Sequence, residues 1–110
     1  MTTDPEIRKT ILAMVEKIKR EYRPEKIILF GSYAYGRPGR DSDLDFLIVK
    51  QTSERRIDRR VAVAAIVSEL NYFIPVEPMV LTPGEIEEQL KKGNQFIQEI
   101  LEKGEVLYGA

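Results

Sequence analysis

Two apolar runs on either side of a Gly-, Ser- and Asp-rich stretch constrain the fold of this chain more than any other feature. The first run, residues 27–30, reads Ile-Ile-Leu-Phe, and the second covers residues 44–49. Short apolar runs that are rich in β-branched and aromatic residues and bounded by Gly or Asp are typical of buried strands. The sequence therefore predicts a strand, a Gly-Ser turn, a short helical piece, a loop and a second strand.

The stretch between the runs carries two groups of residues with chemical potential. Gly31 and Ser32 stand where the first strand turns into the helical piece. Glycine lets the backbone approach a ligand, and the free N–H groups at a helix start favour an anion such as phosphate. Asp43 and Asp45 are two residues apart, so both carboxylates point to one face of the second strand. Because neighbouring carboxylates repel unless a cation lies between them, the pattern predicts a metal-assisted phosphoryl or nucleotidyl transfer site.

Each half of this pattern also has an ordinary explanation. Gly-Ser and Asp-Ser-Asp are common in turns, and either half alone is more often structural than catalytic. The two halves in this order, between two strands, favour a site. The stretch is neither a P-loop nor a dinucleotide-binding motif, because no Gly-Lys-Ser/Thr follows the glycines and their spacing differs from G-x-G-x-x-G.

The absence of two residue types narrows the chemistry. The chain contains no Cys and no His. A thiolate nucleophile, a Ser-His-Asp triad and a zinc–sulfur or His-ligated metal are therefore excluded. A metal would have to be held by oxygen ligands, which favours Mg²⁺ or Mn²⁺, and a general base would have to be Asp, Glu, Lys or Tyr.

Length and charge indicate a small globular protein. We expect one domain over residues 1–110, with a net charge of −1 that gives no sign of general nucleic-acid binding. No apolar run is long enough to cross a membrane and no signal peptide is visible, so a cytoplasmic location is expected.

Helices and strands are predicted along the rest of the chain. Thr3-Asp4-Pro5-Glu6 is a helix start, and an apolar stripe continues to Tyr22. Thr82-Pro83-Gly84-Glu85 is a capping box that begins another helix. The predicted elements are strands at 26–30, 44–49, 76–81 and 106–108, and helices at 5–22, 54–70, 83–91 and 95–103. Pro78 removes a backbone donor, so its strand is predicted to be irregular or to lie at an edge.

The helix at 54–70 has a predicted cap at Ser53 and two sets of residues that need an explanation. Its buried stripe is predicted to be Ile57, Val61, Ala64, Ala65 and Leu70. Four arginines gather in its first turns: Arg55, Arg56, Arg59 and Arg60. They form either a solvated helix face or a docking patch for an acidic partner or for phosphates.

The motifs Gly31-Ser32-x-Ala34-x-Gly36 and Ser42-Asp43-x-Asp45 resemble the signature of the DNA polymerase beta-like nucleotidyltransferase superfamily. In size the chain resembles the minimal nucleotidyltransferase (MNT) family. The resemblance implies an α/β (α+β) nucleotidyltransferase fold, with a small mixed sheet of three to four strands flanked by helices. It covers most of the chain, while its specific motifs occupy residues 31–45.

The resemblance also implies an activity and a partner. MNT proteins are typically antitoxins that transfer AMP from ATP to a tyrosine hydroxyl of a HEPN-type RNase toxin. Asp43, Asp45 and Glu77 would hold Mg²⁺, with Mn²⁺ as a substitute, and would form the catalytic set. Gly31, Ser32, Ser42 and Arg40 would bind the nucleotide, although Arg37 and Arg40 are also explained as solvated loop charges. A homo- or hetero-oligomer is expected.

Glu77 departs from the family pattern, in which the third acidic residue is usually Asp. Glutamate is one methylene longer, and Mg²⁺ requires near-octahedral geometry, so the change affects metal binding or the position of the base. Glu77 is alternatively a plain charge at a strand end. Two other functions therefore remain open: a binding module that neutralises a partner by contact alone, and an adenylyltransferase for a small molecule.

Overall fold

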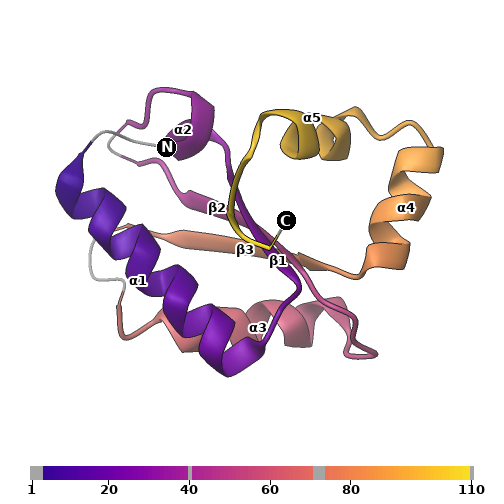
Figure 1. Cartoon of the computed structure of the whole chain (residues 1–110), viewed down its shortest axis with the longest axis horizontal. Helices are drawn as coiled ribbons and strands as arrows, with labels where there is room; N and C mark the ends of the chain where they lie inside the picture. Colours follow the sequence, from indigo (N-terminus) through magenta and orange to yellow (C-terminus); the bar gives the residue numbers. More distant parts are fainter. Residues whose placement is uncertain (1–3, 40, 71–73, 110) are drawn as a thin grey trace.

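A four-stranded mixed sheet forms the centre of the computed structural model, which describes residues 4–39, 41–70 and 74–109. The strands are β1 Lys26–Phe30, β2 Leu44–Val49, β3 Val76–Leu81 and β4 Glu105–Tyr108. They lie in the order β3-β2-β1-β4 (Figure 1). β1 is antiparallel to β2 and to β4, whereas β2 and β3 are parallel. The predicted mixed sheet is confirmed, and β3, which contains Pro78, lies at an edge as predicted.

Two long helices, α1 Pro5–Tyr22 and α3 Arg56–Val67, cover one face of the sheet (Figure 1). The start of α1 is capped as predicted, because the Asp4 carboxylate accepts hydrogen bonds from the backbone N–H groups of Glu6 and Ile7 at 2.9 and 3.4 Å. Its apolar stripe is buried, and the residues that the β2 strand adds to this core are Leu44, Phe46 and Ile48. Leu47 and Val49 lie in the core on the opposite face, so the side chains of β2 alternate between the two faces of the sheet.

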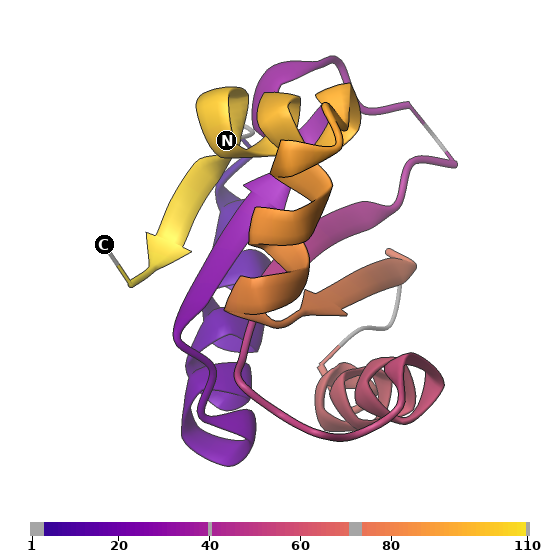
Figure 2. The ribbon, with the colours of Figure 1, turned by 90° about the vertical axis from the view of Figure 1, so that its right-hand side faces the viewer.

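Two shorter helices, α4 Pro83–Lys91 and α5 Gln95–Lys103, cover the opposite face (Figure 2). The predicted capping box at α4 is present: Glu85 N–H donates to the Thr82 hydroxyl at 3.1 Å, and Thr82 N–H donates to the Glu85 carboxylate at 2.7 Å. The second core joins β1, β2 and the end of β3 to α5 and consists of Ile28, Phe30, Leu47, Val49, Leu81, Ile97 and Ile100. None of the helices in the described part of the chain is long and apolar enough to span a membrane.

The predicted buried stripe of α3 is wrong except at Leu70, which follows the helix and packs, partly buried, against the core. Ile57 and Val61 are 55% and 58% exposed, and Ala64 and Ala65 also face outward. The buried residues are instead Arg59, Val63 and Val67. Both sets recur at helical spacing, so hydrophobic periodicity alone does not distinguish them. The burial of Arg59, a residue type that is almost never buried unless paired, rotates the helix away from the predicted orientation.

The bounds of α3 also differ from the prediction. The helix begins after Arg55 rather than after Ser53. The backbone of Glu54 is engaged outside the helix, because its N–H donates to the Thr52 hydroxyl at 3.1 Å and its carbonyl accepts from Arg59 Nε at 2.8 Å. These side-chain contacts satisfy the backbone in a non-helical conformation and so shorten the helix.

Candidate functional site

The Gly-Ser bend lies directly beside the start of β2. Gly31 connects the end of β1 to the short helix α2 Ser32–Tyr35, which contacts both β1 and β2. Phe30, the last residue of β1, is the cross-strand partner of Asp45. A Cβ added to Gly31 would overlap Asp45 Oδ2. The glycine backbone therefore packs against the carboxylate of Asp45, and the structure brings together the two halves of the predicted site.

Asp43 and Asp45 are both half-buried at this end of β2. The pKa of Asp45 is raised above its ordinary value by burial and then by the negative charges of Asp43 and Glu77. The folded chain thus holds a cluster of carboxylates whose charges repel one another. Such a cluster becomes favourable when a cation neutralises it.

Glu77 lies next to Asp45 in the sheet but is engaged elsewhere. The two residues are register partners on the parallel strands β2 and β3. Both carboxylate oxygens of Glu77 accept hydrogen bonds from Arg60 Nη2, at 3.0 and 2.8 Å. Among the described residues, no three acidic side chains gather closely enough to hold a metal ion together. The assignment of Glu77 to the metal set therefore stays a prediction.

The remaining predicted nucleotide ligands lie around the bend and the following loop. Ser32 begins α2, and its carbonyl accepts a hydrogen bond from Gly36 N–H at 3.1 Å. The Ser42 hydroxyl accepts from Gly39 N–H at 2.8 Å, so this side chain holds the loop in front of Asp43. Arg40 lies outside the described residues, and its contact with a triphosphate stays a prediction.

The donor chemistry of the site fits a hard divalent cation. Asp43, just before β2, and Asp45, on β2, supply carboxylate oxygens in half-buried positions with an excess of negative charge. Oxygen ligands of this kind suit Mg²⁺ and Mn²⁺. Asp43 and Asp45 would hold the ion, and Glu77 could contribute its oxygens after it separates from Arg60.

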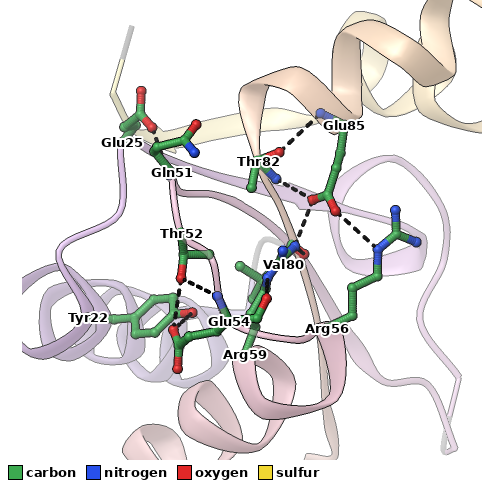
Figure 3. Close-up of polar contacts among 10 residues, drawn as sticks. All are labelled: Tyr22, Glu25, Gln51, Thr52, Glu54, Arg56, Arg59, Val80, Thr82 and Glu85. Carbon is green, nitrogen blue, oxygen red and sulfur yellow. Dashed lines mark hydrogen bonds and ion pairs between the residues drawn. The ribbon is translucent and has the colours of Figure 1, made fainter.

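A second polar cluster, centred on Arg59 and Glu85, was not predicted from the sequence (Figure 3). Arg59 is 6% exposed and donates to the Val80 carbonyl at 3.3 Å and to Glu85 Oε1 at 2.7 Å. Burial raises the pKa of Glu85, but Thr82 N–H and the guanidinium groups of Arg59 and Arg56 outweigh it and hold that pKa at about 2. The cluster fastens α3 to β3 and to the start of α4, and so it holds the strand that carries Glu77.

The four arginines at the start of α3, Arg55, Arg56, Arg59 and Arg60, form neither a purely solvated face nor an unpaired basic patch. Arg55 pairs with Asp58 at 2.9 Å, and Arg60 pairs with Glu77 at 2.8 Å. Arg56 and Arg59 pair with Glu85, at 3.4 and 2.7 Å. Capping-box spacing marked Glu85 as a helix cap, but its pairing with Arg59 spans 26 positions and has no local sequence signal.

Replacing Gly31 with Ala is expected to lower both stability and activity. Gly31 has φ 77° and ψ −159°, a conformation that is almost restricted to glycine, and the new Cβ would displace the Asp45 carboxylate. A strain of this kind costs about 1–3 kcal/mol in the free energy of unfolding. Urea denaturation and a transfer assay measure the two effects.

Gly93→Ala is a matched control. Gly93 also has φ 77°, but nothing lies within 4 Å of a Cβ built there. The Gly93→Ala variant should lose stability through backbone strain but keep its activity. Equal changes of stability and activity in Gly31→Ala and Gly93→Ala would contradict the close packing of Gly31 against Asp45.

The chain is similar to known proteins over most of its length. The family described as "Nucleotidyltransferase domain" matches residues 11–107. "Putative protein adenylyltransferase MJ0604" of Methanocaldococcus jannaschii is 38% identical over 105 residues, which cover 91% of this chain and 96% of that relative. "Putative protein adenylyltransferase MJ1305" of the same organism is 35% identical over 99 residues, covering 86% of this chain and 66% of that relative. This chain thus spans slightly less than two thirds of the length of the second relative.

Solved structures share the fold. A crystal structure described as "a putative nucleotidyltransferase from Sulfolobus solfataricus" has a TM-score of 0.54 and 29% identity over 74% of each chain. A toxin-antitoxin structure with AMP-PNP has a TM-score of 0.56 and 20% identity, over 90% of this chain and 73% of that one. At that identity the likeness shows the fold alone. Because the family match runs from α1 to β4, it includes every strand of the sheet as well as the Gly-Ser bend, and the chain belongs to the nucleotidyltransferase domain family.

Proposed function

We propose that this chain transfers AMP from ATP to a hydroxyl group of a partner protein, and that it acts as the antitoxin of a HEPN-type toxin whose tyrosine is the acceptor. The packing of the Asp45 carboxylate against the Gly31 bend, beside Asp43, is the observation that carries the proposal. The names of the two Methanocaldococcus jannaschii relatives support protein adenylylation as the reaction class. The toxin-antitoxin structures with the same fold support the choice of partner.

The proposed reaction is an in-line substitution at the α-phosphorus of ATP. The acceptor hydroxyl oxygen forms a bond to this phosphorus, the bond to the oxygen that bridges the α- and β-phosphates breaks, and pyrophosphate leaves. The hydroxyl proton passes to a carboxylate or to solvent, and Glu77 is the candidate acceptor once it is free of Arg60. The reaction therefore needs a triphosphate held in one orientation and a hydroxyl presented opposite the leaving group.

The residues of the site have separate tasks in this scheme. Backbone N–H groups after Gly31 and the Ser32 hydroxyl would bind outer phosphate oxygens, and Ser42 keeps the loop before Asp43 in place. Asp43 and Asp45 would hold Mg²⁺. The bound ion would neutralise the charge of the triphosphate and of the leaving pyrophosphate.

The direct test is a transfer assay with the partner protein. The chain is incubated with Mg²⁺, the protein encoded next to it and ATP labelled at the α-phosphate, and the label is expected to appear on a tyrosine of that protein. ATP labelled at the γ-phosphate should leave the partner unlabelled. Transfer of the γ-label, or labelling that persists when both Asp43 and Asp45 are replaced by Asn, would refute nucleotidyl transfer by this site.

One observation favours a second candidate function, neutralisation of a partner by contact alone. Glu77 replaces the usual Asp, and both of its oxygens are engaged by Arg60. Calorimetric titration separates the two functions, since a contact-only module should bind neither Mg²⁺ nor ATP while it still suppresses the partner. An active enzyme should bind both.

A further inference from the structure

The contact between Arg60 and Glu77 joins α3 to the edge strand of the sheet. Arg60 Nη2 donates to both carboxylate oxygens of Glu77, and the two side chains are 53% and 47% exposed. A guanidinium is always charged and is well suited to grip a carboxylate. In the folded chain, the positive charge next to Glu77 is therefore the guanidinium of Arg60.

The backbone that carries this arginine is firmly held. The preceding residue, Arg59, is buried and donates to Glu54, to Val80 and to Glu85. Arg60 therefore projects from a fixed point, over a hollow of about 280 Å³ lined by Arg56, Arg60 and residues 77–81. Because Arg60 and Glu77 are half exposed, the pair can open and close without any rearrangement of the core.

We propose that Arg60 is a positioning residue that competes with the divalent cation for Glu77. Glu77 is the register partner of Asp45, so its carboxylate belongs either to Arg60 or to the acidic cluster around Asp45. While Arg60 holds both oxygens, the cation is left with Asp43 and Asp45; when Arg60 releases them, Glu77 becomes a third ligand. This inference rests on the proposed function, because it concerns the metal of that site.

Mn²⁺ binding tests the competition without any catalytic readout. The binding is measured from the electron paramagnetic resonance signal of free Mn²⁺ in titrations of the native chain, Arg60→Gln, Glu77→Gln and the double variant. An exposed ion pair is worth up to about 1 kcal/mol, so Arg60→Gln is expected to lower the Kd by roughly fivefold. In the Glu77→Gln background the same change should have no effect, because no carboxylate is then released.

Two further variants separate this effect from a general change of charge. Arg55→Gln removes a positive charge from the same helix, where Arg55 pairs with Asp58, and should leave the Kd within about twofold of the native value. Arg60→Lys keeps the charge but loses the planar fork, so its Kd should fall between those of the native chain and Arg60→Gln.

The outcomes are distinct. A native Kd for Arg60→Gln, a gain of equal size in the Glu77→Gln background, or no Mn²⁺ binding by any variant would overturn the inference. Failure of the native chain to label its partner with the α-phosphate of ATP would refute the proposed function instead, and the Mn²⁺ titrations do not depend on that assay.

Discussion

Replacing Asp45 with Asn is expected to abolish nucleotidyl transfer without destabilising the fold. Asn keeps the shape of the side chain but removes the charge that a hard cation requires. Removing one group that stabilises charge in a transition state commonly lowers the rate by about 100- to 1,000-fold, and loss of a metal ligand should reach at least the upper end of that range. The rate of AMP transfer at saturating Mg²⁺ and ATP measures the effect.

The stability of the Asp45→Asn variant should match or exceed that of the native chain at neutral pH. The pKa of Asp45 is raised by burial and by the charges of Asp43 and Glu77, so folding disfavours its ionised form. The protonated form of Asp45 therefore stabilises the native chain relative to the ionised form. This stabilisation is fully present below the ordinary pKa of 3.8 and is lost as pH rises through the raised pKa. The advantage of the variant should therefore shrink as the solution is acidified, which urea denaturation at several pH values will reveal.

Asp41→Asn is the control for this prediction. Asp41 is an exposed aspartate in the loop just before the site, so its replacement should leave transfer and stability close to native. Near-native transfer by Asp45→Asn would show that Asp45 is not part of the reaction centre. A large loss of stability would show that its charge supports the fold instead of opposing it.

Replacing Glu85 with Gln is expected to cause the largest loss of stability. Gln can still accept a hydrogen bond from Thr82 N–H, but it leaves the buried guanidinium of Arg59 without an opposite charge. The difference between the ordinary pKa of 4.5 and the value of about 2 in the folded chain corresponds to about 3–4 kcal/mol at about 1.4 kcal/mol per pKa unit. Urea denaturation should show this loss as a lower midpoint with an unchanged slope.

The effect of Glu85→Gln should depend on pH in a defined window. Because the folded pKa is depressed, the ionised carboxylate contributes its full stability above 4.5 and loses it as pH falls through about 2. The free energies of unfolding of the native chain and of Glu85→Gln should therefore approach each other as pH falls from 4.5 to about 2. Convergence at a higher pH would mean that the partners of Glu85 depress its pKa less strongly than the structure indicates.

Glu88→Gln is the matched control on the same helix. Glu88 pairs with Lys92 at 3.1 Å, and both side chains are more than 60% exposed. The loss for an exposed pair of this spacing should stay below about 0.5 kcal/mol. A loss as large as that of Glu85→Gln would show that the buried arginine is not the source of the effect.

The starts of α1 and α4 and the first three strands were predictable because their signals are local. Asp4 before Pro5, and Thr82 three residues before Glu85, satisfy the free N–H groups of a helix start with neighbours in the chain. The strand bounds follow from apolar runs that end at Gly or Asp. The Gly-Ser bend and the aspartates were predicted to form one site, and the pairing of Phe30 with Asp45 places the bend beside Asp45.

The orientation of α3 was not predictable in the same way. Its two apolar stripes have the same period, and the choice between them depends on Arg59, which sequence reasoning places in solvent. Arg59 is buried because its partners, the Val80 carbonyl and the Glu85 carboxylate, come from β3 and α4. These partners follow Arg59 by 21 and 26 residues. No periodic pattern within a helix reports contacts over such separations.

Most bounds of the helices and strands can be read from the order of the residues, and that order also predicts that Gly31, Asp43 and Asp45 form one site. Capping, turn chemistry and strand alternation act between residues close in the chain, so they are visible in its order. The tertiary structure alone decided which face of α3 is buried and that Arg60 holds Glu77. Both depend on charged side chains that meet across separate elements, where the energy of a contact is set by burial and geometry, and sequence spacing encodes neither.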